Sequence, residues 1–134
     1  MKDKTAGWLK FAEMDKITAE KILEEDGLSN IVLFHSQQMV EKTLKALLEE
    51  NEIDIPKTHG LKKLHFLIPE NIKKIINIEQ ESLGLLDEIY IDSRYPSDIG
   101  LLPSGIATKD EARQIYVMAV NIYEKIIKSL NKEL

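Results

Sequence analysis

The segment SNIVLFHSQQMVEKTLKALLEEN, residues 29–51, decides the fold of this chain. Its large apolar residues recur at helical spacing: Leu33, Val40, Leu44, Leu47 and Leu48. Residues spaced in this way share one side of an α-helix, so the segment predicts an amphipathic helix from Ser29 to Asn51. Gln37 falls inside the apolar stripe, where an apolar side chain is expected.

The other side of this predicted helix carries a polar row: His35, Gln38, Lys42, Lys45 and Glu49. Steps of three and four residues place these side chains on adjoining turns. The two ammonium groups and the titratable ring could together hold a phosphate or a carboxylate. The alternative is a solvated helix face, braced by Glu41 and Lys45 at i, i+4. Spacing alone favours that alternative.

A helix from Thr5 to Glu24 is predicted before this segment by a second stripe: Trp8, Phe11, Ala12, Ala19, Ile22 and Leu23. The acid Asp15 falls in the middle of the stripe. It is either a misaligned surface acid or a buried carboxylate, and a buried carboxylate would need a partner. The sequence leaves both alternatives open.

Three more helices are predicted after Pro56. Thr58 suits the N-cap of a short helix that ends near Phe66. Pro69 suits the first turn of a long helix, whose stripe is Ile72, Ile75, Ile76, Leu83, Leu86, Ile89 and Tyr90. Thr108 and Glu111 form a capping box for the last helix, whose stripe is Ala112, Ile115, Tyr116, Ala119, Ile122, Tyr123, Ile126 and Ile127.

These patterns predict an all-α fold, an up-and-down antiparallel bundle of four long helices plus one short helix. No segment shows the alternation of a strand. A length of 134 residues suits one domain over residues 1–134.

The composition excludes several classes of protein. The chain has no cysteine, no apolar run of the roughly 20 residues that a membrane span needs, and a net charge of −5. We therefore expect a cytoplasmic protein without disulfides, without membrane contact and without broad phosphate binding. The histidines His35, His59 and His65 lack metal-ligand spacing, and there is no glycine-rich phosphate loop. We expect neither a metal nor a cofactor.

Arg94 is one of only two arginines in a chain rich in lysine. It opens the tripeptide Arg94-Tyr95-Pro96, within a predicted loop over residues 92–107. A planar guanidinium binds phosphate or carboxylate in a bidentate manner. Arg94 is therefore predicted either to bind a ligand phosphate or to pair with an internal acid such as Asp15.

Several of these segments together resemble the HEPN family, whose name stands for higher eukaryotes and prokaryotes nucleotide-binding. The resemblance rests first on HSQQMVEKTLKALL, residues 35–48, and PKTHGL, residues 56–61. It extends to Trp8, Ala12 and Asp15 in the first helix, and to Tyr90, Arg94-Tyr95-Pro96 and the helix from Thr108. The chain is thus similar to a stand-alone prokaryotic member.

The resemblance implies a helical bundle with a role in nucleotide or nucleic-acid biology, often in toxin–antitoxin or stress systems. It also implies a homodimer and a minimal nucleotidyltransferase as protein partner. The ligand-binding candidates are His35, Gln38, Lys42, Lys45, Arg94 and Tyr95, with Asp15 and Gln37 as buried polar support. RNA remains an open ligand.

Many HEPN proteins are metal-independent ribonucleases, with an arginine followed after four to six residues by a histidine. Here Arg94 is followed at those positions by Ile99, Gly100 and Leu101, and no histidine occurs after His65. General acid–base catalysis needs a group that titrates near neutrality. The sequence therefore favours a binding module over an enzyme.

Two alternatives stay open beside the binding module. One is a divergent ribonuclease that uses Arg94 with His35 or His59 as catalytic groups. The other is a purely structural, self-associating bundle.

Overall fold

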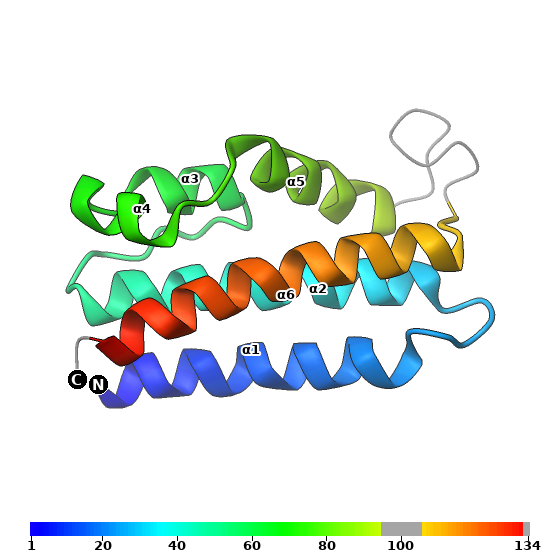
Figure 1. Ribbon diagram of the computed structural model, residues 1–134, viewed down its shortest axis with the longest axis horizontal. Coiled ribbons are helices and arrows are strands. Elements are labelled where there is room, and N and C mark those ends of the chain that lie inside the picture. The colour runs from blue at the N-terminus through cyan, green and yellow to red at the C-terminus, as the bar shows by residue number, and fades with distance from the viewer. Residues whose placement is uncertain (95–105, 133–134) are drawn as a thin grey trace.

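The computed structural model describes the backbone of residues 1–94 and 106–132, and the side chains of residues 1–90 and 106–131. Six helices lie in these ranges (Figure 1): α1 (Asp3–Ile22), α2 (Ser29–Glu50), α3 (Leu61–Phe66), α4 (Glu70–Ile76), α5 (Gln80–Arg94) and α6 (Lys109–Lys132). The long helices α1, α2, α5 and α6 alternate in direction along the chain (Figure 1). The predicted all-helical bundle is confirmed.

Helix α2 is the centre of the bundle. It packs against α1, α3, α5 and α6. In Figure 1, α6 covers its front, α1 lies on one side, and the run from α3 to α5 lies on the other. The face of α2 that α6 does not cover is therefore the face seen from behind.

The predicted apolar stripe of α2 is confirmed as core. Leu33, Val40, Leu44, Leu47 and Leu48 are all buried, and they meet buried residues of α6 such as Ala119 and Ile126 in one hydrophobic cluster. Two residues of the predicted stripes are wrong: Phe11 is 54% exposed, and Ile75, from the stripe predicted after Pro69, is 62% exposed. α1 turns Ala12, Asp15 and Ala19 inward, and Phe11 lies about 100° around the helix from Ala12.

The long helix predicted from Pro69 to Tyr90 is wrong in one respect, because the chain breaks it in two. Asn77 ends α4 with φ +46°, a left-handed conformation that asparagine tolerates better than most residues. Its carbonyl accepts a hydrogen bond from Lys125 Nζ at 3.0 Å. Ile76 and Leu83 are seven residues apart, the spacing that one unbroken helix would place on one side, and both are buried. The apolar pattern therefore fits one helix or two equally well. The bundle therefore has two short helices.

The predicted N-cap of the short helix is also wrong. Thr58 Oγ1 accepts a hydrogen bond from the Gly60 amide at 3.0 Å, which closes a local turn before the helix begins. The cap of α3 comes instead from Asp87 on α5, whose carboxylate accepts from the amides of Leu61 at 2.7 Å and Lys62 at 3.3 Å. A carboxylate at a helix N-terminus satisfies unpaired amides and favours the dipole.

Asp87→Ala is expected to lower the free energy of unfolding by about 1–2 kcal/mol, because two amides of α3 lose their acceptor. The measurement is urea denaturation followed by circular dichroism. Glu88→Ala is the matched control, because Glu88 is the exposed neighbour on the same helix and makes no capping contact among the described hydrogen bonds. Equal losses in the two variants would contradict the capping role.

The start of α6 follows the prediction. The Thr108 amide donates to Glu111 Oε1 at 2.9 Å, and the Glu111 amide donates to Thr108 Oγ1 at 3.1 Å. This reciprocal pair is the predicted capping box. None of the described helices has the length and apolar character that crossing a membrane requires.

His65 connects α3 to the start of α5. Its ring is buried, and Gln80 Nε2 lies 2.9 Å from Nδ1, so Gln80 donates to a neutral ring. Burial lowers the pKa of His65, the nearby Lys73 lowers it further, and Glu70 opposes the shift. Because the folded state holds this proton less tightly than the unfolded chain, protonation of His65 favours unfolding.

The stability from His65 is therefore expected to be complete above its ordinary pKa of 6.5 and to decline as the pH falls below it. Urea midpoints measured at about pH 7.5 and about pH 5.5 should fall more in the wild type than in His65→Gln, which does not titrate. The same decrease in both proteins would show that other groups cause the acid sensitivity.

Candidate functional site

Two buried carboxylates organise the polar row of α2. Asp15 on α1 is 6% exposed and Glu41 on α2 is 3% exposed. Each binds one histidine and one lysine. A buried charge is stable only when it is paired and hydrogen-bonded. The two acids therefore fix the positions of four basic side chains: His35, Lys42, Lys45 and His59.

Asp15 joins α1 to α2. Its Oδ1 lies 2.7 Å from His35 Nδ1, and its Oδ2 accepts a hydrogen bond from Lys42 Nζ at 2.6 Å. His35 and Lys42 are seven residues apart, two turns along α2, so both reach the same carboxylate from one side of the helix. Of the two alternatives for Asp15, the structure has the buried carboxylate with partners.

Glu41 is the centre of a larger cluster. It accepts from Lys45 Nζ at 3.0 Å and from Gln38 Nε2 at 3.2 Å, and His59 Nδ1 lies 3.1 Å from Oε1. The pair of Glu41 and Lys45 is the predicted i, i+4 brace. Lys45 Nζ also lies 5.4 Å from the centre of the Trp8 ring on α1, a cation–π contact.

Gln37 fixes the segment that carries His59. Its Nε2 donates to the His59 carbonyl at 3.1 Å, and its Oε1 accepts from Gln38 Nε2 at 2.8 Å. Gln37 is fully buried, so these two bonds satisfy a polar group that would otherwise be costly. The two predicted support residues, Asp15 and Gln37, thus hold the two histidines from different sides.

Aromatic rings connect the two histidines. The His59 ring stacks on Tyr90 of α5 with centres 5.0 Å apart, and Tyr90 stacks on Phe34 at 6.1 Å. Phe34 in turn meets the edge of the His35 ring at 5.4 Å. The His59 side chain is 58% exposed, so one end of this row is open to a ligand.

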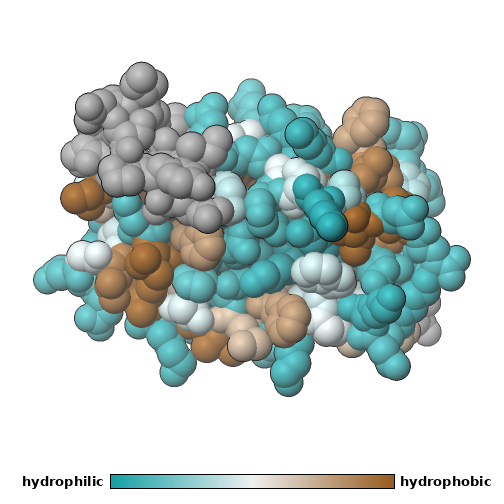
Figure 2. Space-filling view, turned by 180° about the vertical axis from the view of Figure 1, so that it is seen from behind, coloured by the Kyte–Doolittle hydropathy of each residue, from teal (hydrophilic) through white to brown (hydrophobic). Residues whose placement is uncertain are grey.

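We call this surface the histidine face; its members are His35, Gln38, Lys42, Lys45, His59 and Tyr90, with Asp15 and Glu41 beneath. From behind, hydrophilic residues fill the middle of the molecule (Figure 2), where α2 lies between α1 and the run from α3 to α5. Lys42 and Lys45 balance the two carboxylates. The face is thus close to neutral unless a histidine is protonated.

The chemistry open to this face follows from the histidine geometry. A neutral ring that donates from Nδ1 to a carboxylate carries no proton on Nε2, which can then accept a proton or a hydrogen bond. A protonated ring keeps its Nδ1 bond to the carboxylate and also donates from Nε2, which can then bind a phosphate. His35 and His59 both have the carboxylate on Nδ1.

The structure brings together most of the predicted site residues. His35, Gln38, Lys42 and Lys45 lie along one face of α2, and His59 joins them from the segment before α3. Arg94 is the last residue of α5, one turn beyond Tyr90; its side chain lies outside the described residues, as does all of Tyr95. No metal-binding cluster of histidines and acids occurs in the part of the chain that the structure describes.

The sequence pattern does not predict the carboxylate at the centre of the face, Glu41, or the rings beside it, Phe34 and Tyr90. Its spacing to Lys45 predicts only a brace for Glu41, although Glu41 lies between the polar row and the apolar stripe of its own helix. Phe34 adjoins His35, and Tyr90 ends the stripe of the fourth predicted helix. An acid or ring at the border of a stripe is the one signal that could have indicated them.

The comparisons with known proteins agree with this fold. The family model described as HEPN domain matches residues 5–131. The crystal structure of TT1696 from Thermus thermophilus is 24% identical with a TM-score of 0.76, over 95% of this chain and 98% of that one. The structure of ST0689, described as an archaeal HEPN homologue, is 27% identical with a TM-score of 0.71, over 96% and 98%. No curated protein matches the sequence.

Proposed function

We propose, from the premise that the chain belongs to the HEPN domain family, that it is a binding module for a nucleotide and that the nucleotide binds on the histidine face. The observation that carries this proposal is the open His59 ring, stacked on Tyr90 and held by buried Glu41. A ring fixed in this way offers a flat surface for a base and a polar nitrogen for a phosphate or a ribose.

Base stacking on an aromatic ring contributes about 1–3 kcal/mol per base. The His59–Tyr90 pair is oriented before the ligand arrives, so little ordering opposes binding. The phosphate contact is expected to be weaker, because Lys42 and Lys45 already neutralise Asp15 and Glu41. A nucleotide is therefore recognised mainly through its base, with modest affinity.

The test is isothermal titration calorimetry with the adenine, guanine, cytosine and uracil nucleotides. His59→Ala is expected to weaken the affinity about tenfold, because one stacking surface and one polar contact are lost. Lys10→Ala is the control, because Lys10 is an exposed residue of α1 outside the face. Equal affinity in wild type and His59→Ala, or no heat with any nucleotide, would refute the proposal.

The family resemblance adds a second expectation, that the module pairs with a minimal nucleotidyltransferase in a toxin–antitoxin-like or stress system. A small nucleotidyltransferase gene beside the gene for this chain would supply the partner for co-expression. A tagged chain should then retain that protein through size-exclusion chromatography. Separate elution of the two proteins would reject this pairing and leave the nucleotide proposal standing.

A divergent, metal-independent ribonuclease is the second candidate function. What favours it is that two histidines each have Nδ1 on a carboxylate, an orientation that leaves Nε2 available as a base. Purified protein would cleave RNA in the presence of a chelator, and His59→Ala and His35→Ala would each lose that activity. An absence of cleavage across structured and single-stranded RNAs would reject this candidate.

A further inference from the structure

A hollow lies between the start of α1 and the end of α2, outside the histidine face. Its volume is about 300 Å³, and its lining consists of Lys4, Gly7, Trp8, Phe11 and Glu49. A volume of this size is at the small end of the range for sites that bind organic molecules. We call it the α1 hollow, because all of its lining residues except Glu49 belong to α1.

Two aromatic side chains make the α1 hollow apolar. Phe11 is exposed, so its ring is not part of the core, and Trp8 is half-buried. The contact of Lys45 Nζ with the Trp8 ring holds that ring from one side, and Lys45 is itself bound to Glu41. The two aromatic residues thus offer an accessible apolar surface, and one of the two rings is oriented before any ligand arrives.

Gly7 is a destabilising residue in the lining of the hollow. Glycine inside a helix lowers stability relative to alanine, because the unfolded chain gains conformational freedom. The φ of Gly7 is not left-handed. A Cβ at this position would meet no heavy atom within 4 Å, apart from its chain neighbours and its own helix backbone. The packing of the folded chain therefore does not require glycine here, whereas a ligand that approaches the backbone beside Trp8 and Phe11 would require it.

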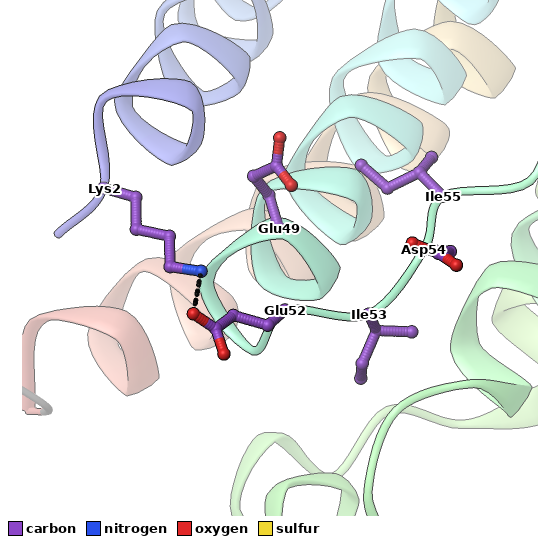
Figure 3. Close-up of a pocket in the computed structure, with 6 residues that line it drawn as sticks. All are labelled: Lys2, Glu49, Glu52, Ile53, Asp54 and Ile55. Atoms are coloured by element: carbon purple, nitrogen blue, oxygen red, sulfur yellow. Dashed lines mark ion pairs between the residues drawn. The ribbon is translucent and has the colours of Figure 1, made fainter.

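Two opposite charges complete the lining. Lys4 and Glu49 both line the hollow, yet neither takes part in an ion pair or a side-chain hydrogen bond among the described residues. The neighbouring Lys2 is engaged elsewhere, because its Nζ lies 2.9 Å from Glu52 Oε1. Figure 3, a view of the adjoining pocket that Glu49 also lines, shows the Glu49 side chain at the end of α2, apart from that ion pair. One ammonium and one carboxylate are thus available to a ligand.

We propose that the α1 hollow binds a free amino acid with an aromatic or large apolar side chain. The side chain of the ligand packs on Trp8 and Phe11, over the open backbone of Gly7. Its carboxylate pairs with the Lys4 ammonium, and its ammonium pairs with the Glu49 carboxylate. A zwitterion therefore matches both charges of the lining, and its apolar part matches the two rings.

Charge selects this ligand over its rivals. A phosphate group would be repelled by Glu49, and an organic cation without a carboxylate would be repelled by Lys4. A residue inside a peptide chain carries neither charge of the free amino acid, so it would leave both groups of the lining unmatched. The proposal does not rest on the nucleotide proposal, because none of the residues that line the α1 hollow is a member of the histidine face.

The first test uses Trp8 as the reporter, because it is the only tryptophan of the chain. L-Phenylalanine, which does not absorb where tryptophan is excited, is expected to change the Trp8 emission with a dissociation constant on the order of 1 mM. L-Alanine lacks the ring, N-acetyl-L-phenylalanine lacks the positive charge, and L-phenylalaninamide lacks the negative charge. Each is expected to bind about tenfold more weakly or not at all. No change with L-phenylalanine, or equal binding of all four compounds, would overturn the proposal.

The second test fills the hollow without weakening the fold. Gly7→Met is expected to weaken L-phenylalanine binding at least tenfold and to raise the urea midpoint, because methionine is the better helix former. Ala6→Met is the matched control, since Ala6 is an exposed neighbour outside the lining, and it should bind as the wild type does. Glu49→Gln is expected to weaken binding about tenfold. Wild-type affinity in Gly7→Met would overturn the site, and a lower urea midpoint would show that the fold itself requires Gly7.

Discussion

Glu41→Ala is expected to lower the free energy of unfolding by about 3 kcal/mol, the loss typical of breaking a buried ion pair from one side. The carboxylate is buried and binds Lys45, Gln38 and His59 together. Without it the Lys45 ammonium, itself largely buried beside Trp8, has no anionic partner in that cluster. Urea denaturation at neutral pH measures the loss.

Two controls separate the charge from the general effect of a substitution on a helix. Glu41→Gln keeps the shape and one acceptor, so it should lose less stability than Glu41→Ala. Glu13→Ala removes an exposed acid of α1 and is expected to change stability by less than about 0.5 kcal/mol. If Glu41→Ala matched Glu13→Ala, the cluster would contribute nothing measurable to the fold.

Helical periodicity was sufficient to predict the framework of this fold. The stripe of α2 and the capping box of α6 are local patterns, and local patterns decide which residues can share one side of a helix. The break at Asn77 was not predictable in this way. A left-handed residue between Ile76 and Ile78 leaves the apolar spacing undisturbed. The hydrogen bonds of Asn77, from its amide to Lys73 and from Lys125 on α6 to its carbonyl, are visible only in the structure.

The histidine face shows a second feature that the sequence pattern alone could not predict. The row from His35 to Lys45 was correctly identified as polar, but a single helix cannot show which acids neutralise it. Asp15 comes from α1 and His59 from the segment before α3, 27 residues before and 17 residues after Lys42 in the sequence. Lys42 and Lys45, which the sequence offers as groups that could hold a phosphate or a carboxylate, bind the protein's own carboxylates. What stays available to a ligand is the pair of histidine rings.

Asp15→Ala is expected to lower the free energy of unfolding by about 2 kcal/mol. The loss is smaller than for Glu41 because Lys42 and His35 are each partly exposed and can turn toward water. Replacing the pair together, as Asp15→Leu with Lys42→Met, is expected to recover most of that stability, since apolar residues of similar volume often substitute for a buried ion pair. Urea denaturation of the single and double variants measures both effects.

The double variant also separates stability from binding, because it leaves His35 without the carboxylate that orients its ring. If nucleotides bind across the whole histidine face, a fully stable double variant should still lose affinity in calorimetry. If they bind only at the His59 end, the affinity should stay at the wild-type value, because Glu41, His59 and Tyr90 are untouched. A double variant no more stable than Asp15→Ala would instead mean that His35 without Asp15 cannot be accommodated, and that the Asp15 cluster is a requirement of the fold.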